Sequence, residues 1–132
     1  MKGFSGDIEK QTLQNTDFRR VIYTGKHSQL VLMNIPPGNE IGLETHPAND
    51  QFLRFELGEG KVIIDGHEYT ITAGHAVVVP AGAKHNVVNT SSLKPLKLYT
   101  IYSPAHHMDR TVHQTKQDAE TSNEEFDGTT SE

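Results

Sequence analysis

Three side chains of the kinds that bind metals, Glu44, His46 and Gln51, lie within eight residues of one another. A carboxylate, an imidazole and an amide oxygen all bind divalent cations in proteins. One interpretation is therefore a metal site. The alternative is a polar hairpin whose side chains bond only to backbone and water.

The alternation of a β-strand directs Glu44 and His46 to the same side. Residues two apart in a strand share a face and lie about 6.5–7 Å apart. Pro47–Asp50 is typical of a turn, so Gln51 begins the next strand. One face of that strand carries Gln51, Leu53, Phe55 and Leu57, and the other carries Phe52, Arg54 and Glu56. Because the apolar face is the interior one, we expect Gln51 to point inward.

A second stretch, Gly74–Asn89, adds a histidine in a matching position. Pro80-Ala81-Gly82 forms a turn, and His85 begins a strand whose inward residues continue with Val87 and Asn89. Two imidazoles and one carboxylate form a triad that suits Fe(II), Mn(II) or Ni(II), and Zn(II) also accepts it.

We therefore predict one divalent transition metal ion, Zn, Mn, Fe or Ni, held by Glu44, His46, Gln51 and His85. The alternative makes Glu44 and Gln51 rim residues and leaves the two histidines as ordinary buried imidazoles. The metal is favoured because an inward carboxylate is costly unless a cation, a donor network or a proton neutralises it.

The chain between residues 20 and 104 has the pattern of an all-β sandwich or barrel. Runs rich in Val, Ile, Leu and Tyr are cut by Gly and Pro at short intervals, and no helical period persists. Asp65-Gly66 is the strongest hairpin signal in the sequence.

Polar extensions flank this region. Residues 1–19 form an N-terminal extension with a short helical turn near Ile8–Leu13. Residues 105–132 form a polar tail, acidic and rich in Ser and Thr toward its end, that cannot support a core of its own. We expect the tail to be disordered or laid over the barrel, with a brief helix near Thr115–Thr121. We assign no role to four carboxylates of the tail and expect them to be exposed to solvent: Asp118, Glu120, Glu124 and Glu125.

Composition narrows the class of protein. A length of 132 residues indicates one domain. The net charge is −5 and Lys and Arg occur singly except at Arg19-Arg20, so we expect no nucleic-acid partner. There is no cysteine, which excludes thiolate ligands. Apolar runs are too short for a membrane span and the first residues lack a secretory signal, so we expect a cytoplasmic protein.

The spacing of these residues resembles the two motifs of the cupin family. The first motif is glycine, five residues, His-x-His, three or four residues, glutamate, six residues and glycine. The matching positions are Gly38, Glu44, His46, Gln51 and Gly58, with Glu44 in place of the first histidine and Gln51 in place of the glutamate. The second motif is complete at Gly74, Pro80, Gly82, His85 and Asn89.

The resemblance implies a cupin jelly-roll barrel, which is a double-stranded β-helix, over about residues 20–104. The same ligand types form the zinc site of mannose-6-phosphate isomerases, so a sugar (phosphate) isomerase is one implied activity. The family also includes dioxygenases and non-catalytic sugar-binding modules, which are two further alternatives. In each case the partner is a small polar molecule inside the barrel. The family and the outward Phe52 together imply a homodimer.

Five further residues are candidates for a pocket wall or lid: Phe55, Lys84, Tyr102, His106 and His107. Lys84 is the cation nearest in sequence to the site and the candidate for gripping a phosphate. For the cluster of His106, His107 and His113, the sequence favours a solvated connector. The alternative is that the tail crosses the barrel mouth and delivers one of them as acid, base or extra ligand.

Overall fold

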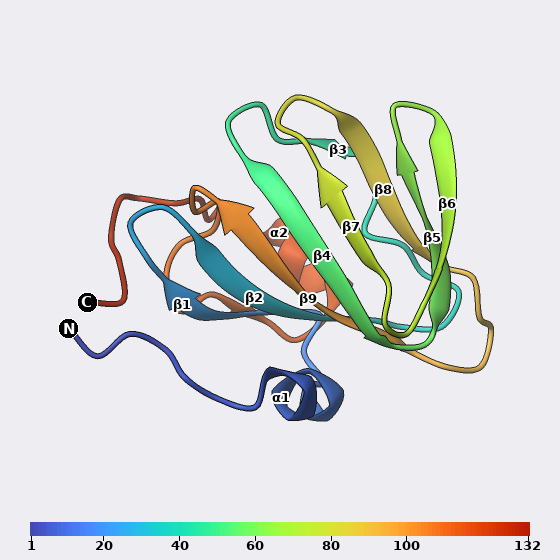
Figure 1. Ribbon diagram of the computed structural model, residues 1–132, viewed down its shortest axis with the longest axis horizontal. Helices are drawn as coiled ribbons and strands as arrows, with labels where there is room; N and C mark the ends of the chain where they lie inside the picture. Colours follow the sequence, from blue (N-terminus) through green and yellow to red (C-terminus); the bar gives the residue numbers. More distant parts are fainter.

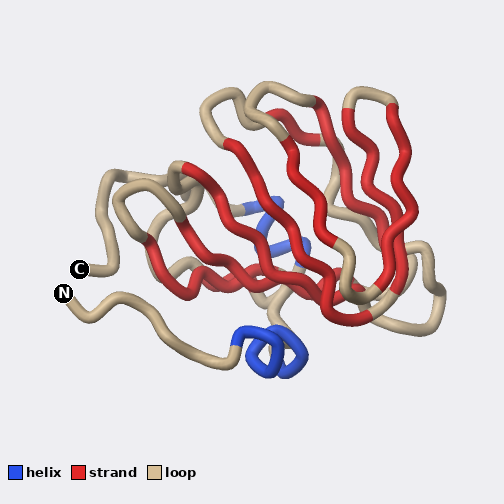
Figure 2. The backbone as a smooth tube through the Cα atoms, viewed as in Figure 1, coloured by secondary structure: helices blue, strands red, loops and turns tan.

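The computed structural model describes residues 1–132 as two antiparallel β-sheets with one short helix near each end of the chain (Figures 1 and 2). The six-stranded sheet has the order β10-β1-β2-β9-β4-β7, and the four-stranded sheet has the order β3-β8-β5-β6. The strands of the larger sheet are β1 (Arg19–Thr24), β2 (Gln29–Ile35), β4 (Asp50–Leu57), β7 (Ala76–Val79), β9 (Leu96–Ser103) and β10 (Val112–His113). Those of the smaller are β3 (Glu44–Thr45), β5 (Glu59–Ile64), β6 (His67–Thr72) and β8 (Lys84–Asn89). The predicted all-β jelly roll is confirmed.

A single apolar core lies between the sheets. Its fully buried members include Val31, Met33, Leu53, Phe55, Val62, Leu96 and Leu98. The predicted alternation holds in β4 from Gln51 to Phe55 and in β8, where His85, Val87 and Asn89 are all buried. It is wrong at Leu57, which is 38% exposed, because the pairing of β4 with β9 shifts register between Phe55 and Leu57.

The hairpin predicted at Asp65-Gly66 is confirmed between β5 and β6. Asp65 has φ 46° and Gly66 has φ 82°, so both central residues are left-handed, as a tight two-residue turn of this type requires. Asp65 also accepts a hydrogen bond from the Lys84 amide at 2.9 Å, which ties this turn to the start of β8.

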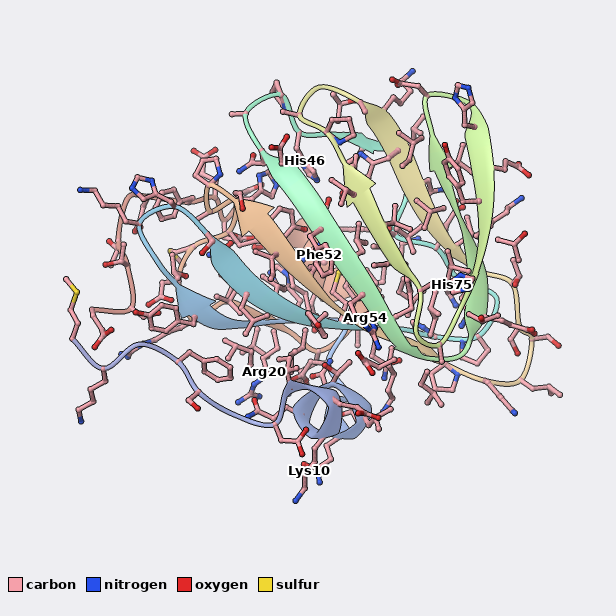
Figure 3. All side chains as sticks on the ribbon, viewed as in Figure 1. Lys10, Arg20, His46, Phe52, Arg54 and His75 are labelled. Carbon is pink, nitrogen blue, oxygen red and sulfur yellow. The ribbon has the colours of Figure 1, made fainter.

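The N-terminal helix is confirmed as α1 (Ile8–Gln14), capped by the Asp7 side chain. It lies against β9 and β4 on the outer face of the larger sheet, where Phe52 is half-buried with its ring 6.4 Å from that of Tyr99 (Figure 3). The homodimer inferred partly from Phe52 stays a prediction. Neither helix is long and apolar enough to cross a membrane.

The C-terminal tail is laid over the barrel. Residues Val112–His113 add the strand β10 to β1, and α2 (Lys116–Thr121) begins at a Thr115–Asp118 capping box. Beyond α2 the chain returns to the barrel, where the Ser131 amide donates to the Thr24 carbonyl at 2.9 Å. The prediction of a solvated connector is wrong, because His107 and His113 are only 5% and 7% exposed.

We expect Phe55→Ala to lower the free energy of unfolding by about 3–5 kcal/mol, because it leaves a cavity in a fully buried core. Leu43, which is 64% exposed, provides the matched control, and Leu43→Ala should change stability by less than about 0.5 kcal/mol. Urea unfolding measures both. Equal losses in the two variants would contradict this assignment of the core.

Candidate metal centre

Glu44, His46 and His85 come together at one end of the barrel. Each offers a ligand atom, and these atoms all lie within 4.8 Å of one another. Glu44 and His85 face each other as register partners in the β3–β8 pair. His46 follows β3, and Figure 3 places it near the end where β4 begins. The ring of His46 is 5.1 Å from that of His85, and its Nε2 is 3.1 Å from Glu44 Oε2.

Two turns hold the halves of this cluster together. The Gly82 amide donates to the His46 carbonyl at 3.0 Å, and the Ala81 amide donates to an Asp50 carboxylate oxygen at 2.8 Å. The Pro80–Ala83 turn before β8 is thus bonded to the loop between β3 and β4. The motif residues Pro80 and Gly82 therefore set the position of His46 as well as that of His85.

The hydrogen bonds of His85 leave one ring nitrogen free. Its Nδ1 is 3.0 Å from the Ala83 carbonyl and must donate to it, so the proton lies on Nδ1 and the lone pair on Nε2. Nε2 is buried and has no hydrogen-bond partner. An unpaired buried acceptor costs about 1–3 kcal/mol, which a bound cation would offset.

Gln51 is oriented in a similar way. Its Nε2 donates to Thr100 Oγ1 at 3.0 Å, and that hydroxyl in turn donates to the Phe52 carbonyl at 2.9 Å. The amide oxygen of Gln51 is left buried without a partner. The residues thus fit a divalent cation, with unpaired acceptors on Gln51 and His85. Ligation by Gln51 stays a prediction.

The electrostatics of the cluster favour an ionised carboxylate. Burial acts to raise the pKa of Glu44, but the hydrogen bond with His46 and the electrostatic influence of Arg19 and the two neighbouring imidazoles outweigh it. The pKa of Glu44 therefore lies below its ordinary value. An ionised carboxylate is the form that binds a cation.

The cluster is closed on one side by aromatic and imidazole rings. The ring of His106 lies 4.1 Å from His46 and 5.3 Å from Tyr102, to which it is nearly parallel at 28°. The ring of His107 lies 4.8 Å from His106, and its Nε2 is 3.3 Å from the Tyr102 hydroxyl. Burial, helped by the nearby His107 and His46, lowers the pKa of His106 to about 4. The His106 ring is therefore neutral at pH 7.

Glu124 joins this group, so its assignment to a solvated end is wrong. Its side chain is only 12% exposed, and its carboxylate accepts from His107 Nδ1 at 2.7 Å and from the Met108 amide at 2.8 Å. Burial opposes ionisation, but these two hydrogen bonds lower the pKa of Glu124 to about 2. The other three carboxylates of the predicted solvated end, Asp118, Glu120 and Glu125, are exposed.

Arg19 is a second buried residue that the sequence interpretation missed. It is 7% exposed, its Nη1 lies 3.3 Å from His113 Nδ1, and its Nε has no partner. Its positive charge helps to lower the pKa of Glu44. The available signal was the alternation of β1, in which Arg19 and Val21 share the buried face.

The remaining candidates lie elsewhere. Lys84 is exposed and adjacent to buried His85, so it lies on the opposite face of β8. Phe55 is part of the apolar core. Arg54, which was expected to point outward, pairs with Glu56 at 3.2 Å. His75, which was not a candidate, lies at the other end of the barrel from His46 (Figure 3).

Comparison with known proteins gives consistent results. The Cupin domain family matches residues 31–102. The uncharacterized protein YrkC of Bacillus subtilis is 47% identical over 124 residues, covering 89% of this chain and 66% of YrkC. The uncharacterized protein L612 of Acanthamoeba polyphaga mimivirus is 44% identical over 104 residues, covering 76% of this chain and 65% of L612. The chain thus spans just under two thirds of the length of both relatives.

Among solved structures, the crystal structure of BH2720 from Bacillus halodurans is similar over nearly the whole chain. It is 43% identical, with a TM-score of 0.89, and the match covers 92% of this chain and 96% of BH2720. The similarity therefore extends beyond the barrel into the terminal segments.

The buried hydrogen bonds of Glu124 give a pH-dependent prediction. Because the pKa of Glu124 is lower in the folded protein than in the unfolded chain, its stabilising effect is present above about pH 5. It is lost as the pH falls toward 2. We expect Glu124→Gln to cost about 1–2 kcal/mol at pH 7 and almost nothing at pH 2.

Urea unfolding of the wild type and this variant at both pH values measures the difference. Glu125→Gln, at an exposed neighbour, is the control and should match the wild type throughout. A Glu124→Gln cost that persists unchanged at pH 2 would contradict the role assigned to the ionised carboxylate.

Proposed function

The chain belongs to the cupin family, and we propose on that premise that it is a metal-dependent enzyme acting on a small polar metabolite inside its barrel. The observation that supports it is the convergence of Glu44, His46 and His85, with the buried Nε2 of His85 unpaired. These three residues would hold one Zn, Mn, Fe or Ni ion, with Gln51 as a neutral fourth ligand. A divalent ion there supplies Lewis acidity or activates water or dioxygen.

The charge of the ligand set favours an oxygen-rich or anionic substrate. One carboxylate and two neutral imidazoles leave a divalent site with net positive charge, and the buried Arg19 adds another positive charge close to Glu44. A hydroxyl, carbonyl or carboxylate oxygen complements such a site.

The isomerase, dioxygenase and binding-module alternatives share this ligand set and differ in what happens to the bound molecule. Lys84, the cation proposed for gripping a phosphate, lies on the outward face of β8, so it gives no support to a sugar phosphate. Activity assays distinguish the three: an isomerase interconverts sugars, a dioxygenase consumes oxygen, and a binding module binds its ligand without turnover.

We expect protein purified without chelators to contain about one transition metal ion per chain. His46→Ala and His85→Ala should each weaken binding more than about tenfold, because each removes a ligand. Both should remain folded, since the core does not depend on the ion. His75→Ala, at the other end of the barrel, is the matched control and should keep full metal content.

Elemental analysis measures content, and titration of the apo protein with Zn, Mn, Fe and Ni measures affinity. A wild type that takes up none of these ions would overturn the metal site. Equal loss of metal in His75→Ala would show that the effect of the other two variants is not local.

A further inference from the structure

His106 lies at the protein surface beside His46, one of the candidate ligands. Its ring contacts that of His46 at 4.1 Å and stacks on Tyr102, yet it is only half-buried, whereas both neighbours are at least nine-tenths buried. A small molecule that approaches the cluster from this side meets the His106 ring first.

The ring nitrogens of His106 make no hydrogen bond within the protein, unlike those of the other histidines around the cluster. In His85, Nδ1 donates to the Ala83 carbonyl, and in His46, Nε2 bonds to Glu44. His107 uses both nitrogens, on Glu124 and Tyr102. Among these rings, only that of His106 has both nitrogens available for a ligand.

The position of His106 is fixed through its backbone. The side chain of Gln29, only 1% exposed, accepts from the His106 amide at 3.1 Å and from the His107 amide at 2.9 Å. Its own amide group donates to the His107 carbonyl at 2.7 Å. Asn49 donates to the carbonyls of Pro104 and Ala105 at 2.6 and 3.2 Å, just before this point.

These hydrogen bonds hold the backbone of His106 in a defined position. Breaking the Gln29 contacts would leave buried polar groups without partners, which is unfavourable. The tail therefore presents a ring with unbonded nitrogens at a defined place, as preorganised binding groups are presented.

His106 is not placed as a ligand itself. The group whose ligand atoms lie within 4.8 Å of one another consists of Glu44, His46 and His85. The His106 ring instead contacts the ring of one of these ligands, His46.

We propose that His106 is a substrate-contacting residue, whose imidazole forms a hydrogen bond with a molecule bound at the Glu44, His46 and His85 cluster. This inference rests on the proposed function. Because the His106 ring touches that of a ligand, the two binding points are close together. The substrate class that fits is a small molecule with two adjacent oxygen atoms, one for the ion and one for the imidazole.

The test uses cobalt(II) as the metal and azide as the probe. Azide has three atoms, so one end can bind the ion while the other accepts a hydrogen bond. His106→Phe keeps the ring shape and removes both nitrogens, and His75→Phe at an exposed position is the control. We expect His106→Phe to weaken azide binding about tenfold, the loss of one good hydrogen bond. Cobalt affinity and the absorption spectrum without azide should stay as in the wild type.

Gln29→Leu provides a second arm, because it removes the hydrogen bonds that position His106 and leaves the ring itself in place. It should weaken azide binding with cobalt affinity retained, and it should speed hydrogen exchange at the His106 and His107 amides. If Gln29→Leu fails to fold, His106→Phe still decides the question.

Other results would overturn the inference in distinct ways. Unchanged azide affinity in His106→Phe would reduce His106 to a packing residue. If His106→Phe lost cobalt affinity or showed an altered spectrum without azide, His106 would be identified as a metal ligand. A wild type that takes up no cobalt would reject the metal centre itself and this inference with it, before any variant is compared.

Discussion

The pairing of β3 with β8 is the constraint on which the rest of the site depends. These two strands set Glu44 opposite His85, and β3 is only two residues long. So short a strand has few ladder hydrogen bonds of its own, and its position is held by the loops that follow it. The bonds from Gly82 to His46 and from Ala81 to Asp50 supply that support. The relative position of the two motifs, which are far apart in sequence, is thus fixed by the contact between these two turns.

The site combines two kinds of polar group with different roles. Some are fully paired and act as supports, such as Gln29 and Asn49, whose amides hold the tail. Others, His85 Nε2 and the Gln51 amide oxygen, are buried and unpaired. Such atoms are rare in folded proteins and call for an explanation, such as a bound ion. Paired supports around unpaired acceptors are the expected arrangement for binding a cation.

What the sequence could predict follows from the range of the interactions involved. Glu44, His46 and His85 could be predicted from the sequence because strand alternation and turn residues act over a few positions. Glu124 was not, because its contact with His107 joins residues on either side of β10 and α2. The polar composition of the tail indicated solvent exposure, but composition does not reveal that specific hydrogen bonds hold a segment against a barrel. Leu57 was misplaced because a register shift is not visible in a period of two.

The Gln29 contacts link a residue of β2 to a segment more than seventy positions later in the chain. In a relative with a shorter or displaced tail, this glutamine would lose its three hydrogen bonds to the tail and keep only the one that it donates to Thr24 Oγ1. An apolar residue of similar size would then be the more stable choice at that position. The identity of this single β2 residue is thus a marker, readable from sequence alone, for which members of the family close their barrel with their own C-terminal segment.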